Sequence, residues 1–157
     1  IACWYAGPKV AEHNWPNNTF YGSYIASSYG TDDKFEAPYD LRNNTNPVVN
    51  NTDGSIVGYK YFNFDAKRLS DDLKLCLRLI PEGIDGTIDI MMDRPWTSQG
   101  GKKIGQIDLK ADMPKTSTEV TADIDASQLV GVHAIFFLFK SDTKEKSLCT
   151  LEDFVFE

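Results

Sequence analysis

The residues of this chain that could do acid–base chemistry are its paired carboxylates, and their spacing does not form a recognisable active site. Acidic pairs occur at Asp32 with Asp33, at Asp71 with Asp72, and at Asp123 with Asp125. Hydrolysis of a glycosidic bond needs two carboxyls that face each other across a cleft. Adjacent acids in polar segments are more simply explained as solvated or turn-capping residues. The pattern therefore does not predict a self-contained hydrolase.

Histidines and cysteines give no stronger indication of chemistry. His13 lies in an irregular stretch and His133 begins an apolar run. The sequence has no H-E-x-x-H or G-x-S-x-G motif. Cys3, Cys76 and Cys149 are far apart and odd in number, and none belongs to a C-x-x-C pair, so neither a zinc site nor a redox pair is indicated. Buried thiols and one disulfide remain as alternatives.

Charge and composition exclude two classes of partner. The chain has 157 residues and a net charge of -7, with scattered basic residues. Binding to nucleic acid needs clustered Lys and Arg, so no nucleic-acid partner is expected. The stretch "SQGGKK" lacks the G-K-[ST] ending of a phosphate loop and predicts a hairpin turn. No apolar run is long enough for a membrane span, and Ile1 in first position indicates a mature or excised piece.

From residue 53 onward, short apolar runs alternate with turn residues. No window shows a helical stripe, and the recurring strands predict an all-β fold, a sandwich or a barrel. In residues 73–79, four leucines alternate with other residues, which predicts a strand with one buried face. Around Gly105 the apolar positions change parity, which predicts a bulge. The runs 56–64 and 133–139 are apolar on both faces, which favours a sandwich with covered central strands.

The stretch "DGSIVGYKYFNF", residues 53–64, carries aromatic residues at both parities. Successive side chains of a strand point to opposite faces. We therefore expect Tyr59 and Tyr61 on one face and Phe62 and Phe64 on the other. The stretch is predicted to be an inner strand with a structural role and no catalytic one.

The first part of the chain has a different pattern. Residues 1–22 hold two Trp and little periodicity, and we interpret them as an arm or linker from a neighbouring domain. Residues 23–157 are predicted to form the sandwich, with "SYIAS" as its first strand. Aromatic residues outside the predicted strands could stack on sugar rings or pack against other parts of the protein. These residues are Trp4, Trp15, Tyr21, Tyr29, Tyr39 and Trp96.

Several stretches together resemble carbohydrate-binding modules of family 6. More narrowly, they resemble the C-terminal domain of glycoside hydrolase family 43 enzymes that attack arabinoxylan. The stretches are "SYIAS", "NNTDGSIVGYKYFNF", "LKLCLRL", "GTIDIMMDRP", "GGKKIGQIDL", "GVHAIFFLF" and "LCTLEDFVFE". The resemblance implies a jelly roll of two antiparallel sheets. It also implies a non-catalytic module that directs a secreted hydrolase, in the same polypeptide, to xylan or arabinoxylan.

The resemblance also implies a sugar site in the loops at one end of the sandwich. The family's aromatic, Trp and Asn positions fall near Asn50, near Pro114 or Lys115, and at Thr150. None of these has the family's residue type. Either the ligand is held differently, or the domain is a structural brace for a catalytic domain and binds no sugar. The candidate ligand-binding residues are Asn50, Asn51, Asp53, Tyr39, Trp96 and Thr150, and we expect Trp96 at the opposite end of the sandwich.

A structural calcium ion is a further expectation from the resemblance. The acidic position of the closing motif corresponds to Glu152, and Asp32 or Asp33 could add oxygen ligands.

Overall fold

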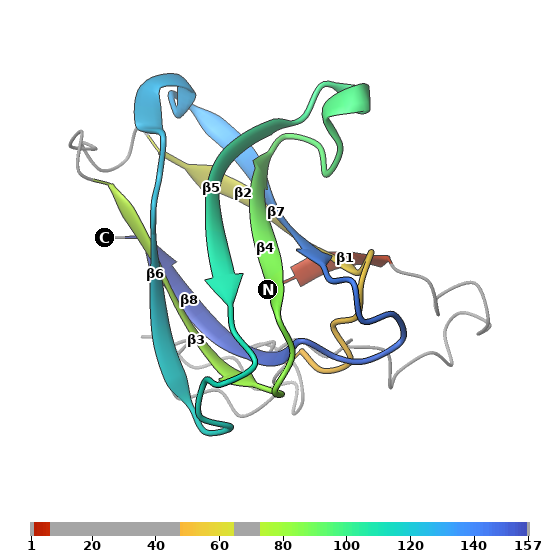
Figure 1. The fold of residues 1–157 in the computed structure, drawn as a ribbon. Coiled ribbons are helices and arrows are strands. Elements are labelled where there is room, and N and C mark those ends of the chain that lie inside the picture. Colours follow the sequence, from red (N-terminus) through yellow and green to blue (C-terminus); the bar gives the residue numbers. More distant parts are fainter. Residues whose placement is uncertain (1, 7–47, 65–72, 157) are drawn as a thin grey trace, which may run out of the picture.

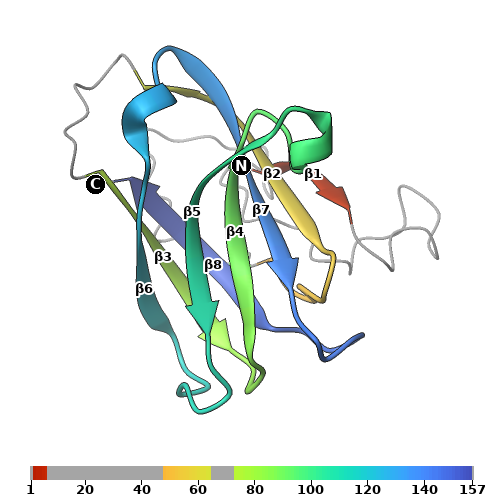
Figure 2. The same cartoon turned by 45° about the horizontal axis from the view of Figure 1, so that its top comes forward.

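The chain folds as two antiparallel β-sheets packed face to face (Figures 1 and 2). This computed structural model describes residues 2–6, 48–64 and 73–156. The strands are β1 (Ala2–Ala6), β2 (Ile56–Asn63), β3 (Lys74–Pro81), β4 (Gly86–Met92), β5 (Lys102–Leu109), β6 (Thr118–Asp123), β7 (Val132–Lys140) and β8 (Cys149–Phe156). The larger sheet has the order β1-β2-β7-β4-β5 and the smaller one β6-β3-β8. The prediction of an all-β sandwich is confirmed.

Helical structure is limited, in the described ranges, to two short 3-10 turns. These are η3 (Thr97–Gln99) and η4 (Ala126–Gln128). No helix of this part of the chain has the length and apolar character needed to cross a bilayer.

The core lies between the sheets and follows the alternation of the strands. Leu75, Leu77 and Leu79 of β3 are fully buried and face Ile88 and Ile90 of β4 across the core cluster. Because a strand points every second side chain to the same face, the leucine alternation predicted this buried face correctly. The bulge near Gly105 is also confirmed, since the β4–β5 register passes from Gly105 to Lys103 and leaves Ile104 as the extra residue.

The aromatic residues of β2 do not divide between two faces as we expected. The register with β7 shifts between Tyr59 and Phe62. Because of this irregularity, Tyr59, Phe62 and Phe64 all join one aromatic cluster with Phe154 and Phe156. The Tyr59 ring lies 4.7 Å from that of Phe154, in an edge-to-face arrangement. The side chain of Tyr61 lies outside what the structure describes.

Residues 2–6, which we assigned to an arm, form a strand of the large sheet. Strand β1 pairs antiparallel with β2, and its backbone aligns Ala6 with Ile56. The remainder of residues 1–22, and the predicted strand at "SYIAS", lie outside the described residues. The boundary at residue 22 stays a prediction.

The connections between strands gather at the two ends of the sandwich (Figure 1). We call one the Asp53 end, which holds residues 48–55 before β2 and the connections 82–85, 110–117 and 141–148. We call the other the Trp96 end, which holds the connections 93–101 and 124–131. The turns η3 and η4 mark the Trp96 end at the top of Figure 1.

Candidate functional site

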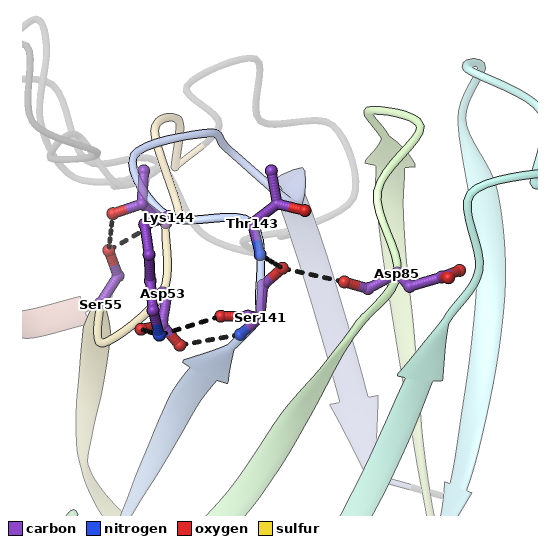
Figure 3. Close-up of polar contacts among 7 residues, drawn as sticks. Asp53, Ser55, Asp85, Ser141, Thr143 and Lys144 are labelled. Atoms are coloured by element: carbon purple, nitrogen blue, oxygen red, sulfur yellow. Dashed lines mark hydrogen bonds and ion pairs between the residues drawn. The ribbon is translucent and has the colours of Figure 1, made fainter.

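Hydrogen bonds of side chains and backbone groups from three segments meet at the Asp53 end (Figure 3). We call this group the polar loop cluster. Its members are Asp53 and Ser55 before β2, Asp85 between β3 and β4, and Ser141, Thr143 and Lys144 after β7.

Asp53 is held by two donors from the β7–β8 connection. Its Oδ1 accepts from the backbone N–H of Ser141 at 2.8 Å, and its Oδ2 lies 2.5 Å from the Lys144 ammonium. The hydrogen bond from Lys144, with that from Ser141, lowers the pKa of Asp53 below its ordinary value. Asp53 is therefore a carboxylate at neutral pH and can accept hydrogen bonds but not act as a general acid.

Ser141 joins the connections of the polar loop cluster to one another. Its hydroxyl donates to the backbone carbonyl of Asp85 at 2.9 Å and accepts from the N–H of Thr143 at 3.1 Å. Ser141 is itself 7% exposed. A buried hydroxyl that both donates and accepts fixes the backbone around it. No motif marked Ser141 in the sequence, because the pairing depends on residues far apart in the chain.

The buried side chain of Asn51 stabilises the Asp53 end through hydrogen bonds to the backbone. Its amide nitrogen donates to the carbonyls of Val48 and Cys149, both at 3.0 Å, and the residue is 2% exposed. The fold thus uses the Asn51 amide to join the segment before β2 to the start of β8. Thr52 is buried as well, with its N–H donating to the Ser55 hydroxyl at 3.0 Å.

The outer surface of the Asp53 end carries groups that can reach a ligand. Asn50 is exposed and has a positive φ of 60°. The Lys144 side chain is 68% exposed. Thr150 is half-buried in β8, where its backbone pairs with Ile80. Of the other predicted ligand residues, Tyr39 lies outside the described residues.

Trp96 lies at the opposite end, as expected. It is 38% exposed and immediately precedes η3. The structure therefore does not bring Trp96 together with Asn50, Asn51, Asp53 and Thr150. Val130 and Val132 are also exposed, and they flank the start of β7 at this same end.

Apart from His133 and Asp93, which contact each other, the described groups suited to catalysis are separated from one another. The Asp85 carboxylate accepts from the N–H of Ala111 at 2.7 Å and so binds the β5–β6 connection. His133 lies at the Trp96 end, where its Nδ1 is 2.7 Å from Asp93 Oδ1. Burial raises the pKa of the Cys149 thiol, which keeps this group protonated and unreactive. In the part of the chain that the structure describes, no two of these groups form a nucleophile–base pair.

The predicted calcium ligand Glu152 contacts an arginine. Its Oε2 lies 3.5 Å from Arg78 Nε, and the same guanidinium donates to Asp153. No three acidic, His or Cys side chains of residues 48–64 and 73–156 lie together as metal ligands do. At Glu152 a guanidinium already contacts Oε2, and its charge would repel a calcium ion at the buried Oε1, which accepts no hydrogen bond from the residues that the structure describes, so these residues do not fit that ion. Asp32 lies outside the described residues.

Comparison with known proteins gives matches in structure alone. No family model matches the sequence, and no curated protein gives a significant match. A family 6 carbohydrate-binding module from Clostridium cellulolyticum, in complex with xylose, matches with a TM-score of 0.52 at 21% identity, over 71% of this chain and 76% of that chain. A β-1,3-glucan-binding family 6 module from Bacillus halodurans matches with a TM-score of 0.51 at 20% identity, over 71% and 74% of the two chains.

A larger enzyme contains a region of the same fold. A glycoside hydrolase family 43 arabinoxylan arabinofuranohydrolase from Bacillus subtilis, in complex with cellotetraose, matches with a TM-score of 0.52 at 19% identity. The match covers 67% of this chain and 20% of that enzyme, so this chain spans only about a fifth of it.

The fold and the polar loop cluster together define an all-β sandwich domain that has a polar surface formed by its loops. More specifically, the chain has the fold of family 6 carbohydrate-binding modules, and the resemblance seen in the sequence is confirmed at the level of the fold.

Proposed function

We propose that this chain is a non-catalytic carbohydrate-binding module that directs a secreted hydrolase to plant cell-wall polysaccharide of the xylan or arabinoxylan type. The observation that carries the proposal is the location of the polar loop cluster. It lies at the end of a sandwich whose solved relatives in fold were crystallised with xylose or bind β-1,3-glucan. A catalytic hydrolase domain in the same polypeptide is the proposed partner.

The chemistry of the polar loop cluster supports this proposal. Sugar hydroxyls both donate and accept hydrogen bonds, and a carboxylate beside an ammonium offers one group of each kind. Asp53 and Lys144 form such a pair, and the Lys144 side chain is largely exposed. The buried contacts of Asn51 and Ser141 hold the two loops in place before a ligand arrives. A preformed site binds with less loss of conformational entropy.

Affinity electrophoresis tests the proposal. The chain is run in gels that contain arabinoxylan, xylan, β-glucan or no polysaccharide. We expect retardation in the xylan-type gels and a reduction of that retardation in Lys144→Ala. Lys102→Ala is the matched control, because Lys102 is an exposed lysine at the Trp96 end that contacts Gln128.

The outcomes separate the site from the function. If Trp96→Ala abolishes the retardation and Lys144→Ala leaves it unchanged, the sugar site lies at the Trp96 end and not at the Asp53 end. A folded protein that no gel retards would contradict binding to these polymers.

The structural brace is a second candidate function, favoured by a different observation. Trp96, Val130 and Val132 are the large hydrophobic residues exposed among those described, and all three lie at the Trp96 end. Exposed apolar side chains at one end of a domain can contribute to a contact with another protein surface. If no polysaccharide binds, this end is the expected contact with a catalytic domain.

A further inference from the structure

Two consecutive acidic residues reach the same guanidinium from strand β8. Arg78 of β3 pairs in register with Asp153, whereas Leu79 pairs with Leu151. Glu152 is therefore the extra residue of a bulge. In a regular strand, neighbouring side chains point to opposite faces, but a bulge redirects one of them. As a result, both carboxylates contact Arg78.

We call Arg78, Glu152 and Asp153 the Arg78 cluster. Their side chains are more buried than charged side chains usually are. The side chains are 28%, 23% and 3% exposed, respectively. A carboxylate as buried as that of Asp153 requires a cation next to it, because ionisation away from water is otherwise very unfavourable. The guanidinium is always charged and has donors in a planar fork that matches carboxylate oxygens.

Arginine and calcium would compete for the same oxygens. Calcium takes six to eight oxygen ligands at roughly 2.3–2.6 Å. An ion bound to the Glu152 carboxylate would lie a few ångströms from a guanidinium that is 3.5 Å from Oε2. Both carry positive charge and would repel each other at this distance, even though Glu152 Oε1 is buried and accepts no hydrogen bond from the described residues.

We propose that the Arg78 guanidinium supplies the positive charge at this bulge, in the place where the family resemblance predicts calcium. The fold at β3 and β8 is then independent of calcium, and one arginine side chain does what a bound ion would do. This inference concerns stability and stands apart from sugar binding.

Thermal unfolding in EDTA, in calcium and in magnesium tests the inference. The proteins compared are the wild type, Arg78→Met, Lys74→Met and Glu152→Gln. The wild type is expected to unfold at the same temperature in all three. Arg78→Met should lower Tm by roughly 10 °C, because it leaves a buried carboxylate without its cation. In this variant calcium, but not magnesium, should restore part of the loss. Lys74→Met is the matched control, since Lys74 lies on the same strand in an exposed ion pair with Asp123 and should change Tm little.

Glu152→Gln decides the outcome even if Arg78→Met fails to fold. A wild-type Tm that falls in EDTA, recovers with calcium, and loses this response in Glu152→Gln would overturn the inference. A calcium response that persists in Glu152→Gln places the ion elsewhere, and the comparison of Arg78→Met with Lys74→Met then decides whether Arg78 is the cation here. A loss of Tm in Arg78→Met no larger than that in Lys74→Met would also overturn it.

Discussion

Replacing Asn51 with alanine should reduce stability without removing a ligand contact. Asn51 donates two buried hydrogen bonds, to Val48 and to Cys149, and alanine makes neither. Each such bond contributes about 1 kcal/mol net, and a small void adds to the loss, so we expect about 2–3 kcal/mol in the free energy of unfolding. For a domain of this size that is a decrease of roughly 5–10 °C in Tm.

Urea denaturation monitored by tryptophan fluorescence measures this change as a shift of the midpoint at constant slope. Asn50→Gly is the control, because glycine adopts the positive φ of this exposed neighbour without strain. Polysaccharide binding by Asn51→Ala should match that of the wild type well below its Tm. A loss of less than about 1 kcal/mol would refute the reasoning that these bonds join the segment before β2 to β8. Binding lost at full stability would instead make Asn51 a ligand residue.

Three further predictions concern packing and charge. Gly86→Ala should destabilise the fold by about 2 kcal/mol in denaturant unfolding, because a Cβ would lie 2.4 Å from the Leu148 side chain and 2.5 Å from a backbone carbonyl; an unchanged midpoint would show that the backbone adjusts. Phe154→Ala should cost about 3 kcal/mol by the same assay, since its ring contacts the aromatic cluster from β8, and a loss below 1 kcal/mol would contradict that role. The pKa of Asp53 is lowered in the folded state. Its contribution to the free energy of unfolding is therefore complete above the unfolded pKa of about 4 and is lost as the pH falls through the lower, folded-state pKa. Lys144→Met should therefore be less stable than the wild type at about pH 7, and the difference in Tm should shrink as the pH falls below about 4.

Strand alternation was the part of the fold that the sequence predicted well. The leucines of β3 and the isoleucines of β4 face the core at every second position, as their spacing indicates. This holds because burial on one face is a local property that each strand shows by itself. The bulge at β5 was predictable for the same reason, since it interrupts the alternation within a single strand.

Features that depend on pairing between distant strands were not predictable. The irregularity that sends Tyr59 and Phe62 to one cluster arises from the register with β7, and nothing within residues 53–64 marks it. The assignment of Asn51 and Asp53 to a ligand site rested on loop position alone. Their distant partners could not be predicted, since the Asn51 amide donates to Cys149 and Asp53 pairs with Lys144. Glu152 was assigned as a calcium ligand from the family resemblance, and its contact with Arg78 of another strand could not be seen in the sequence.

The order of the large sheet has a consequence for how the chain folds. Ile56 of β2 aligns with Leu138 of β7, and Leu75 of β3 aligns with Phe156 of β8. The central pairings of both sheets therefore join early parts of the chain to its last two strands. Contacts between residues so distant in sequence require closure of long loops and slow the folding of all-β domains. During synthesis, β2 and β3 can pair earlier with β1 and β6, but β2 must wait for β7 and β3 must wait for β8. Their apolar faces are then at greatest risk of aggregation, which a chaperone would relieve.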